Sequence, residues 1–147
     1  MNIHPIDAWL ELARTRDAAA LDTLLADDVV FISPVVHTPQ QGKALTTAYL
    51  SGAFKVFFNP TFRYVREIIG PSDAMLEFET EIDGILVNGV DIIKWNADGK
   101  ILEFKVMLRP LRAINLIHER MGAILATMQR PTQGGKDGMR QSDLPGR

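Results

Sequence analysis

The chain has 147 residues, of which 46% are hydrophobic and 23% are charged, and its formal net charge is -2. This length suits one domain with a sizeable core, and the slightly acidic charge gives no reason to expect nucleic acid or an anionic membrane as a partner. The absence of cysteine excludes disulfides, thiolate nucleophiles and cysteine metal sites. Neither a signal peptide nor a membrane-spanning apolar run is seen, so we expect a cytoplasmic protein.

The N-terminal part of the chain predicts three helices and one strand. Apolar residues between Ile6 and Ala13 recur with the i, i+3, i+4, i+7 spacing of an amphipathic helix. A second, short helix is predicted within residues 18–26, after a capping aspartate. A strand over residues 28–33 and a third helix over residues 41–57 complete this part.

From residue 60 the apolar residues recur with a period of two. Four strand-like segments lie within residues 61–70, 74–83, 85–95 and 100–109, and turns such as "DG" and "NADG" separate them. Because short links join antiparallel neighbours, these segments predict an antiparallel sheet. One face of it is apolar and the other carries both charge signs, so the first packs or encloses and the second is wet.

Three glutamates, Glu77, Glu79 and Glu81, alternate along the charged face of one predicted strand. Like charges in a row repel each other, and no histidine lies within two residues of them. We therefore expect cross-strand ion pairs with basic residues of neighbouring strands, and no metal site.

A last helix is predicted after Pro110. Its apolar residues recur at alternating steps of three and four: Ile114, Ile117, Met121, Ile124 and Met128. Two interpretations stay open, a helix that lies on its own domain and a helix that contacts a second copy. Residues 131–147 hold four glycines and two prolines, so we expect a flexible tail after a single domain of residues 1–130.

The element order and three motifs resemble the nuclear transport factor 2-like superfamily, in its SnoaL-like and ketosteroid isomerase-like branch. The motifs are "ALDTLLADDVVFISPV", "QGKALTTAYL" and "VDIIKWNADGKILEFKVML", and the similarity runs from about Ile6 to Leu108. The resemblance implies an α+β fold: a cone-shaped α+β barrel whose curved antiparallel sheet packs against three N-terminal helices, with an added C-terminal helix. It also implies a pocket between sheet and helices, and a homodimer.

The resemblance to ketosteroid isomerase retains only one of three functional positions. That family's tyrosine hydrogen-bond donor falls on Trp9, its general-base aspartate on Ser33, and its protonated aspartic acid on Asp91. A serine hydroxyl has no useful basicity near neutral pH unless a base activates it. We therefore do not expect the same steroid isomerisation by the same route.

Asp91 is the strongest single candidate for chemistry. Strand alternation places it with Ile93 and Trp95 on the inward face, where a carboxylate is costly unless it is paired, hydrogen-bonded or protonated. Desolvation would raise its pKa and make it a hydrogen-bond donor or a general base near neutrality. The alternative is that Asp91 bonds a neighbouring polar group and does no chemistry.

Two histidines are further candidates. His37 follows a proline corner at the expected pocket rim, and it is either an acid/base partner of Asp91 or an exposed loop residue. His118 lies beside the seam of the last helix and is a weaker candidate for a ligand or acid/base role.

The pocket is expected to be apolar and to bind a small apolar molecule. The predicted ligand-binding residues are Trp9, Phe31, Tyr49, Phe78, Ile93, Phe104 and Val106. Trp9 and Tyr49 are the most informative, because each has a polar tip that needs a partner when buried.

Two functions remain open on the sequence alone. The first is a cofactor-independent isomerase or lyase with Asp91, Ser33 and His37 as catalytic residues and with no metal. The second is a non-catalytic ligand-binding or dimerisation module of the same fold.

Overall fold

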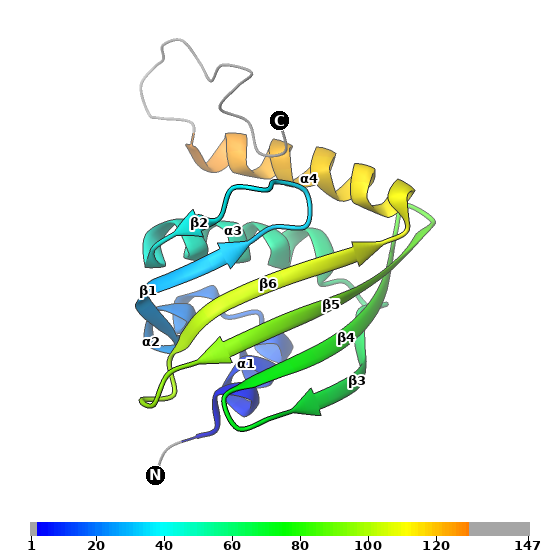
Figure 1. Ribbon diagram of the computed structural model, residues 1–147. Helices are drawn as coiled ribbons and strands as arrows, with labels where there is room; N and C mark the ends of the chain where they lie inside the picture. The colour runs from blue at the N-terminus through cyan, green and yellow to red at the C-terminus, as the bar shows by residue number, and fades with distance from the viewer. Residues whose placement is uncertain (1–2, 130–147) are drawn as a thin grey trace.

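A computed structural model describes residues 3–129, which form helices packed on one face of a curved sheet (Figure 1). In chain order the elements are α1 (Pro5–Thr15), the 3-10 helix η1 (Ala18–Ala20), α2 (Leu21–Leu24), β1 (Leu25–Ile32), β2 (Gln40–Gln41), α3 (Lys43–Phe57), β3 (Arg63–Ile69), β4 (Asp73–Ile82), β5 (Ile85–Trp95), β6 (Ile101–Arg109) and α4 (Leu111–Gln129). The predicted tail, 131–147, lies outside the described residues.

The six strands form one sheet in the order β2-β1-β6-β5-β4-β3. The four strands β3 to β6 pair with their chain neighbours in antiparallel fashion, as their short turns predict. The exception to an antiparallel sheet is β1, which pairs with β6 in parallel. This pairing has no local signal, because more than half of the chain's described length separates the two strands and no hairpin joins them.

Strand alternation divides the sheet into an inner and an outer face. On β4 the side chains of Leu76, Phe78 and Thr80 are buried, while those between them reach the outer face. On β5, Asp91 lies in the corresponding inward row, as predicted. Figure 1 shows α1 and α3 on the far side of the strands, where they cover the inner face.

The last helix, α4, packs on α3 and on the end of the sheet. Its buried stripe is Ala113, Ile117, Met121 and Leu125, a run with a constant step of four. The close approach depends on Gly52 of α3, where an added Cβ would lie 3.3 Å from Met121. The helix therefore lies on its own domain. Ala113 and Leu125 are buried where the predicted seam has the half-buried Ile114 and Ile124, and the side chain of Met128 lies outside the described part of the chain.

The outer face carries the expected ion pairs, although their partners come from β3. Arg66 Nε lies 3.3 Å from a carboxylate oxygen of Glu77, and Arg63 lies 2.8 Å from Glu79. Among the described helices, none combines the length and the apolarity that a membrane span requires.

Candidate functional site

A cavity lies between the inner face of the sheet and helices α1, α3 and α4. The space open to the centre of a water molecule is about 60 Å³. Six of the seven predicted ligand-binding residues line it: Trp9, Phe31, Tyr49, Phe78, Phe104 and Val106. Ile93 does not, because it is fully buried in the core beside the cavity.

Asp91 brings the carboxyl group of β5 to this cavity. Its side chain is buried, with 6% of the residue exposed. Burial raises the pKa of Asp91 to about 7, and a hydrogen bond from Tyr64 lowers it in part. Near neutral pH the group is thus divided between a neutral acid, which can donate a hydrogen bond, and a carboxylate, which can accept a proton.

A chain of hydrogen bonds joins helix α1 to Asp91. Trp9 donates from Nε1 to the Tyr64 oxygen at 3.0 Å, and the Tyr64 hydroxyl donates to Asp91 Oδ2 at 2.7 Å. Burial and the neighbouring Asp91 charge raise the pKa of Tyr64 well above its ordinary value, so the phenol stays protonated and keeps its donor role. The polar tip of Trp9 thereby finds the partner that its burial requires.

Tyr64 is the site residue that the sequence analysis missed. It stands in β3, two strands away from β5, and the bond reaches Asp91 across β4. The available signal was a phenol placed two residues after Phe62, in the same alternating row. That row marks an inward face, yet it does not identify the distant partner.

Gly89 makes room for the cavity floor. It pairs with Phe78 of β4, and a Cβ at this position would lie 2.5 Å from the tip of the Phe78 ring and 2.8 Å from the Met107 carbonyl oxygen. Without a side chain there, the Phe78 ring lies over the strand and packs against Tyr64 with a centroid distance of 6.2 Å. A glycine inside a strand commonly marks such a close approach.

Ser33 lines the cavity at the end of β1. Its hydroxyl oxygen accepts hydrogen bonds from the backbone N–H groups of Val35, at 3.0 Å, and Val36, at 3.3 Å. The hydroxyl therefore stabilises the turn that follows the strand. Since both bonds use the oxygen as acceptor, the hydroxyl proton remains available to a ligand, but no base activates it among these contacts.

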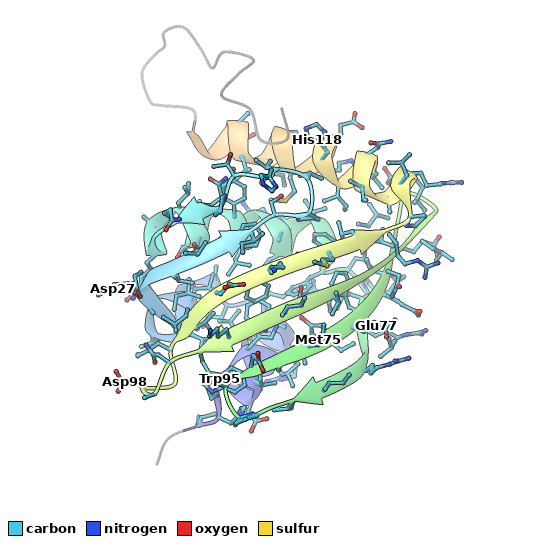
Figure 2. All side chains as sticks on the ribbon, in the orientation of Figure 1. Asp27, Met75, Glu77, Trp95, Asp98 and His118 are labelled. Atoms are coloured by element: carbon cyan, nitrogen blue, oxygen red, sulfur yellow. The ribbon has the colours of Figure 1, made fainter. Side chains whose placement is uncertain are left out.

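The structure reverses the expected order of the two histidines as candidates for the site. His37 is exposed and is absent from the cavity lining, because the turn at Ser33 is followed by a surface loop. Of the two alternatives for His37, the structure therefore shows the exposed loop residue, and His37 is not placed to pair with Asp91. His118 of α4 does line the cavity. Figure 2 labels it on that helix.

No group of three His, Asp or Glu residues within 3–129 is arranged to hold a metal ion. The cavity offers one carboxyl group with a pKa near neutrality, a phenol that orients it, and a mostly apolar wall that also includes Ser33, Tyr49 and His118. Such a site can hold a small apolar molecule and can donate a proton to, or accept one from, a single polar atom of it.

The comparison with known families decides the identity of this fold. The family model of the SnoaL-like domain matches residues 6–104. This chain belongs to the SnoaL-like family, within the NTF2-like superfamily. Its four helices and curved, open sheet with a C-terminal helix match the cone-like α+β fold that the resemblance implies.

Solved structures similar to this SnoaL-like protein include a steroid delta-isomerase from Pseudomonas aeruginosa. The two are 31% identical, with a TM-score of 0.81, over 86% of this chain and 93% of the other. An uncharacterized protein with a cystatin-like fold from Silicibacter pomeroyi is 30% identical, with a TM-score of 0.75, over 81% and 83% of the two chains. An NTF2-like protein of unknown function from Mesorhizobium loti shares the fold at 20% identity, with a TM-score of 0.63, over 72% and 88%. No curated protein sequence matches the chain.

Proposed function

We propose that this SnoaL-like protein binds a small apolar carbonyl compound in the cavity, and that Asp91 exchanges a proton with the carbonyl oxygen. The observation that carries the proposal is the buried Asp91 carboxyl, which faces an apolar cavity and has a pKa of about 7. In its neutral form it donates its proton to the oxygen while a water molecule takes up a proton from the neighbouring carbon, and the product is the enol. Cofactor-independent isomerases and lyases use such an enol.

The proposed ligand is no larger than one substituted ring. The cavity volume of about 60 Å³ is well below the roughly 300 Å³ at which pockets for drug-sized ligands begin. A steroid would have to displace several aromatic side chains of the lining. The serine at position 33 is a second argument against steroid isomerisation by the route of the steroid delta-isomerases, because it supplies no base.

Ser33 and His118 complete the proposed ligand contacts. Both line the cavity, from the end of β1 and from α4 respectively. A hydroxyl and an imidazole placed there can orient the ligand or a water molecule. His118 thus takes the role that the sequence alone gave to His37, and Ser33 keeps its role.

Acetophenone and ethylbenzene form a matched pair of test ligands, because they differ mainly in the carbonyl group. We expect acetophenone to bind the wild-type protein more tightly than ethylbenzene at about pH 6, where Asp91 is mostly neutral. Asp91→Leu should remove this preference while ethylbenzene binding persists. Equal binding of the two ligands to the wild type would contradict the proposal.

Proton exchange separates an enzyme from a binding module. In heavy water, the wild type should speed deuterium incorporation at the acetophenone methyl group, and Asp91→Asn should lose most of that acceleration. The second candidate is a non-catalytic ligand-binding module, which the missing base at Ser33 favours. It predicts binding of acetophenone with no exchange above the buffer rate.

We also propose a homodimer formed through the outer face of the sheet. Large apolar side chains are exposed there, including Met75 at 42% and Met107 at 52%. Figure 2 labels Met75 and Glu77 on β4. Charges of both signs lie beside them, such as Arg66 and Glu77, so the same patch on two copies can be complementary to itself.

A further inference from the structure

We infer that an anion subsite at Arg16 adjoins the cavity across a wall of aromatic side chains, so that the ligand is an apolar ketone that carries a carboxylate. The inference rests on the proposed function and specifies its substrate class. It starts from a surface groove between the end of α1 and the segment after α3. The groove offers about 250 Å³ to water centres and is open to solvent.

The groove and the cavity share a wall. Phe58, Phe62 and Tyr64 line both of them. The rings of Phe58 and Phe62 pack edge to face with centroids 4.6 Å apart, and both residues are only half-buried. These packed rings separate the cavity from the groove, so a ligand that extends from the Asp91 carboxyl into the groove has to turn the half-buried Phe58 and Phe62 side chains aside, next to the Tyr64 phenol that orients that carboxyl.

The charge of the groove is positive although the net charge of the chain is -2. Arg14, Arg16 and Arg63 line it, and no acidic residue does. Arg14 pairs with Glu11 at 2.6 Å and Arg63 pairs with Glu79 at 2.8 Å. Within residues 3–129 no ion pair is formed by Arg16, which makes it the available anion contact of the groove.

Arg16 also contacts the shared wall. Its guanidinium carbon lies 5.9 Å from the centroid of the Phe58 ring, within the range of a cation–π contact. Its backbone ends α1 in the left-handed region, at φ 59°, and its N–H donates to the Leu12 carbonyl at 2.7 Å. The helix end thus fixes the base of this side chain next to the wall.

The two sites together select a ligand with two features. The ketone oxygen meets Asp91 in the cavity, and a carboxylate a few bonds away meets the Arg16 guanidinium, which suits carboxylate geometry. Aryl keto acids have this arrangement. A suitable probe is 4-oxo-4-phenylbutanoate, which is acetophenone with a short carboxylate arm, and its neutral isostere is the corresponding primary amide.

The test measures the affinity of both probes for the full chain by calorimetry, at about pH 6 and at low and high salt. We expect the keto acid to bind about fivefold more tightly than the amide at low salt, with the advantage lost in high salt. Arg16→Gln should abolish the advantage without changing amide affinity. Arg112→Gln, an exposed arginine of α4 outside the groove, is the matched control and should change neither affinity.

The outcomes distinguish the subsite from the proposed function. Acetophenone binding with no difference between keto acid and amide, or with a difference that Arg16→Gln leaves intact, would overturn the subsite alone. Equal binding of acetophenone and ethylbenzene to the wild type would overturn the carbonyl role of Asp91. Gln at position 16 keeps the same backbone demand as Arg, so a folding defect is not expected, and a thermal melt of the variant checks this.

Discussion

The Tyr64 hydroxyl of β3 donates a 2.7 Å hydrogen bond to Asp91 Oδ2 of β5, although β4 lies between the two strands. The bond runs across the inner face of the sheet, past the β4 row that contains Phe78. Gly89, the β5 partner of Phe78, leaves the space that this arrangement needs. The acid of the site is thus held by groups from three strands and one helix.

The first prediction concerns the pH dependence of folding stability. The pKa of Asp91 is about 7 in the folded chain and about 3.9 when unfolded, so between these values the folded state binds the extra proton. Stability therefore falls as pH rises through this window, by about 4 kcal/mol at most. Asp91→Asn replaces the titrating carboxyl group by a neutral amide. The variant should therefore be more stable than the wild type at about pH 8 and similar to it at about pH 4.

Urea denaturation at several pH values measures this difference. Tyr64, which contacts Asp91, keeps its proton across this range because its pKa lies well above its ordinary value, so it adds no pH dependence of its own. Parallel stability curves for wild type and Asp91→Asn would contradict the raised pKa.

The second prediction concerns the hydrogen-bond chain. Tyr64→Phe removes the donor to Asp91 and the acceptor of Trp9 Nε1 together, so we expect a loss of about 2 kcal/mol in the free energy of unfolding. The pKa of Asp91 should rise further, because the Tyr64 bond lowers it. Tyr49→Phe, another phenol of the lining, is the control for a changed cavity surface and should leave that pKa in place.

The third prediction concerns Gly89. Gly89→Ala places a methyl group against Phe78 and the Met107 carbonyl oxygen, so it should destabilise the fold by about 2 kcal/mol and reduce ligand binding. The matched control is Gly122→Ala in α4, where nothing lies within 4 Å of the new Cβ. That change should stabilise the protein by up to about 1 kcal/mol, because alanine is the better helix former. Equal effects at both positions in thermal melts would refute the close approach.

The fourth prediction concerns the dimer. Met107→Lys places a charge in the exposed apolar patch of the outer face and should shift the protein toward monomer in analytical ultracentrifugation. Leu111→Lys, at the start of α4, where the side chain is more exposed than that of Met107, should leave the assembly unchanged. A dimer that tolerates Met107→Lys but not Leu111→Lys would move the interface to α4.

The sequence predicts the fold well where the signals are local. Alternation and short turns predict β3 to β6, and the inward row of β5 predicts that Asp91 lies on the cavity side, as it does. The parallel pairing of β1 with β6 has no such signal, because it joins distant segments. The buried stripe of α4 differs from the predicted seam because the helix packs through Ala113 and Leu125, which the alternating steps of three and four did not include.

The sequence predicts Asp91 as the acid of the site, but it does not identify the residues that surround Asp91. Ser33 accepts two backbone bonds in a turn, a local role that a residue-by-residue resemblance does not reveal. His37 is carried to solvent by the loop after that turn, and His118 reaches the cavity because α4 folds back over α3. Tyr64 depends on a diagonal contact across a strand, which periodicity alone does not encode.

The most direct measurement of the central claim is the pKa of Asp91 itself. Carbon-13 NMR of the aspartate carboxyl signals, assigned with the Asp91→Asn variant, follows this one group through a pH titration. We predict a midpoint of about 7 for Asp91, set by its burial in the cavity. A midpoint of about 4, the ordinary aspartate value, would contradict the buried acid on which the proposed function depends.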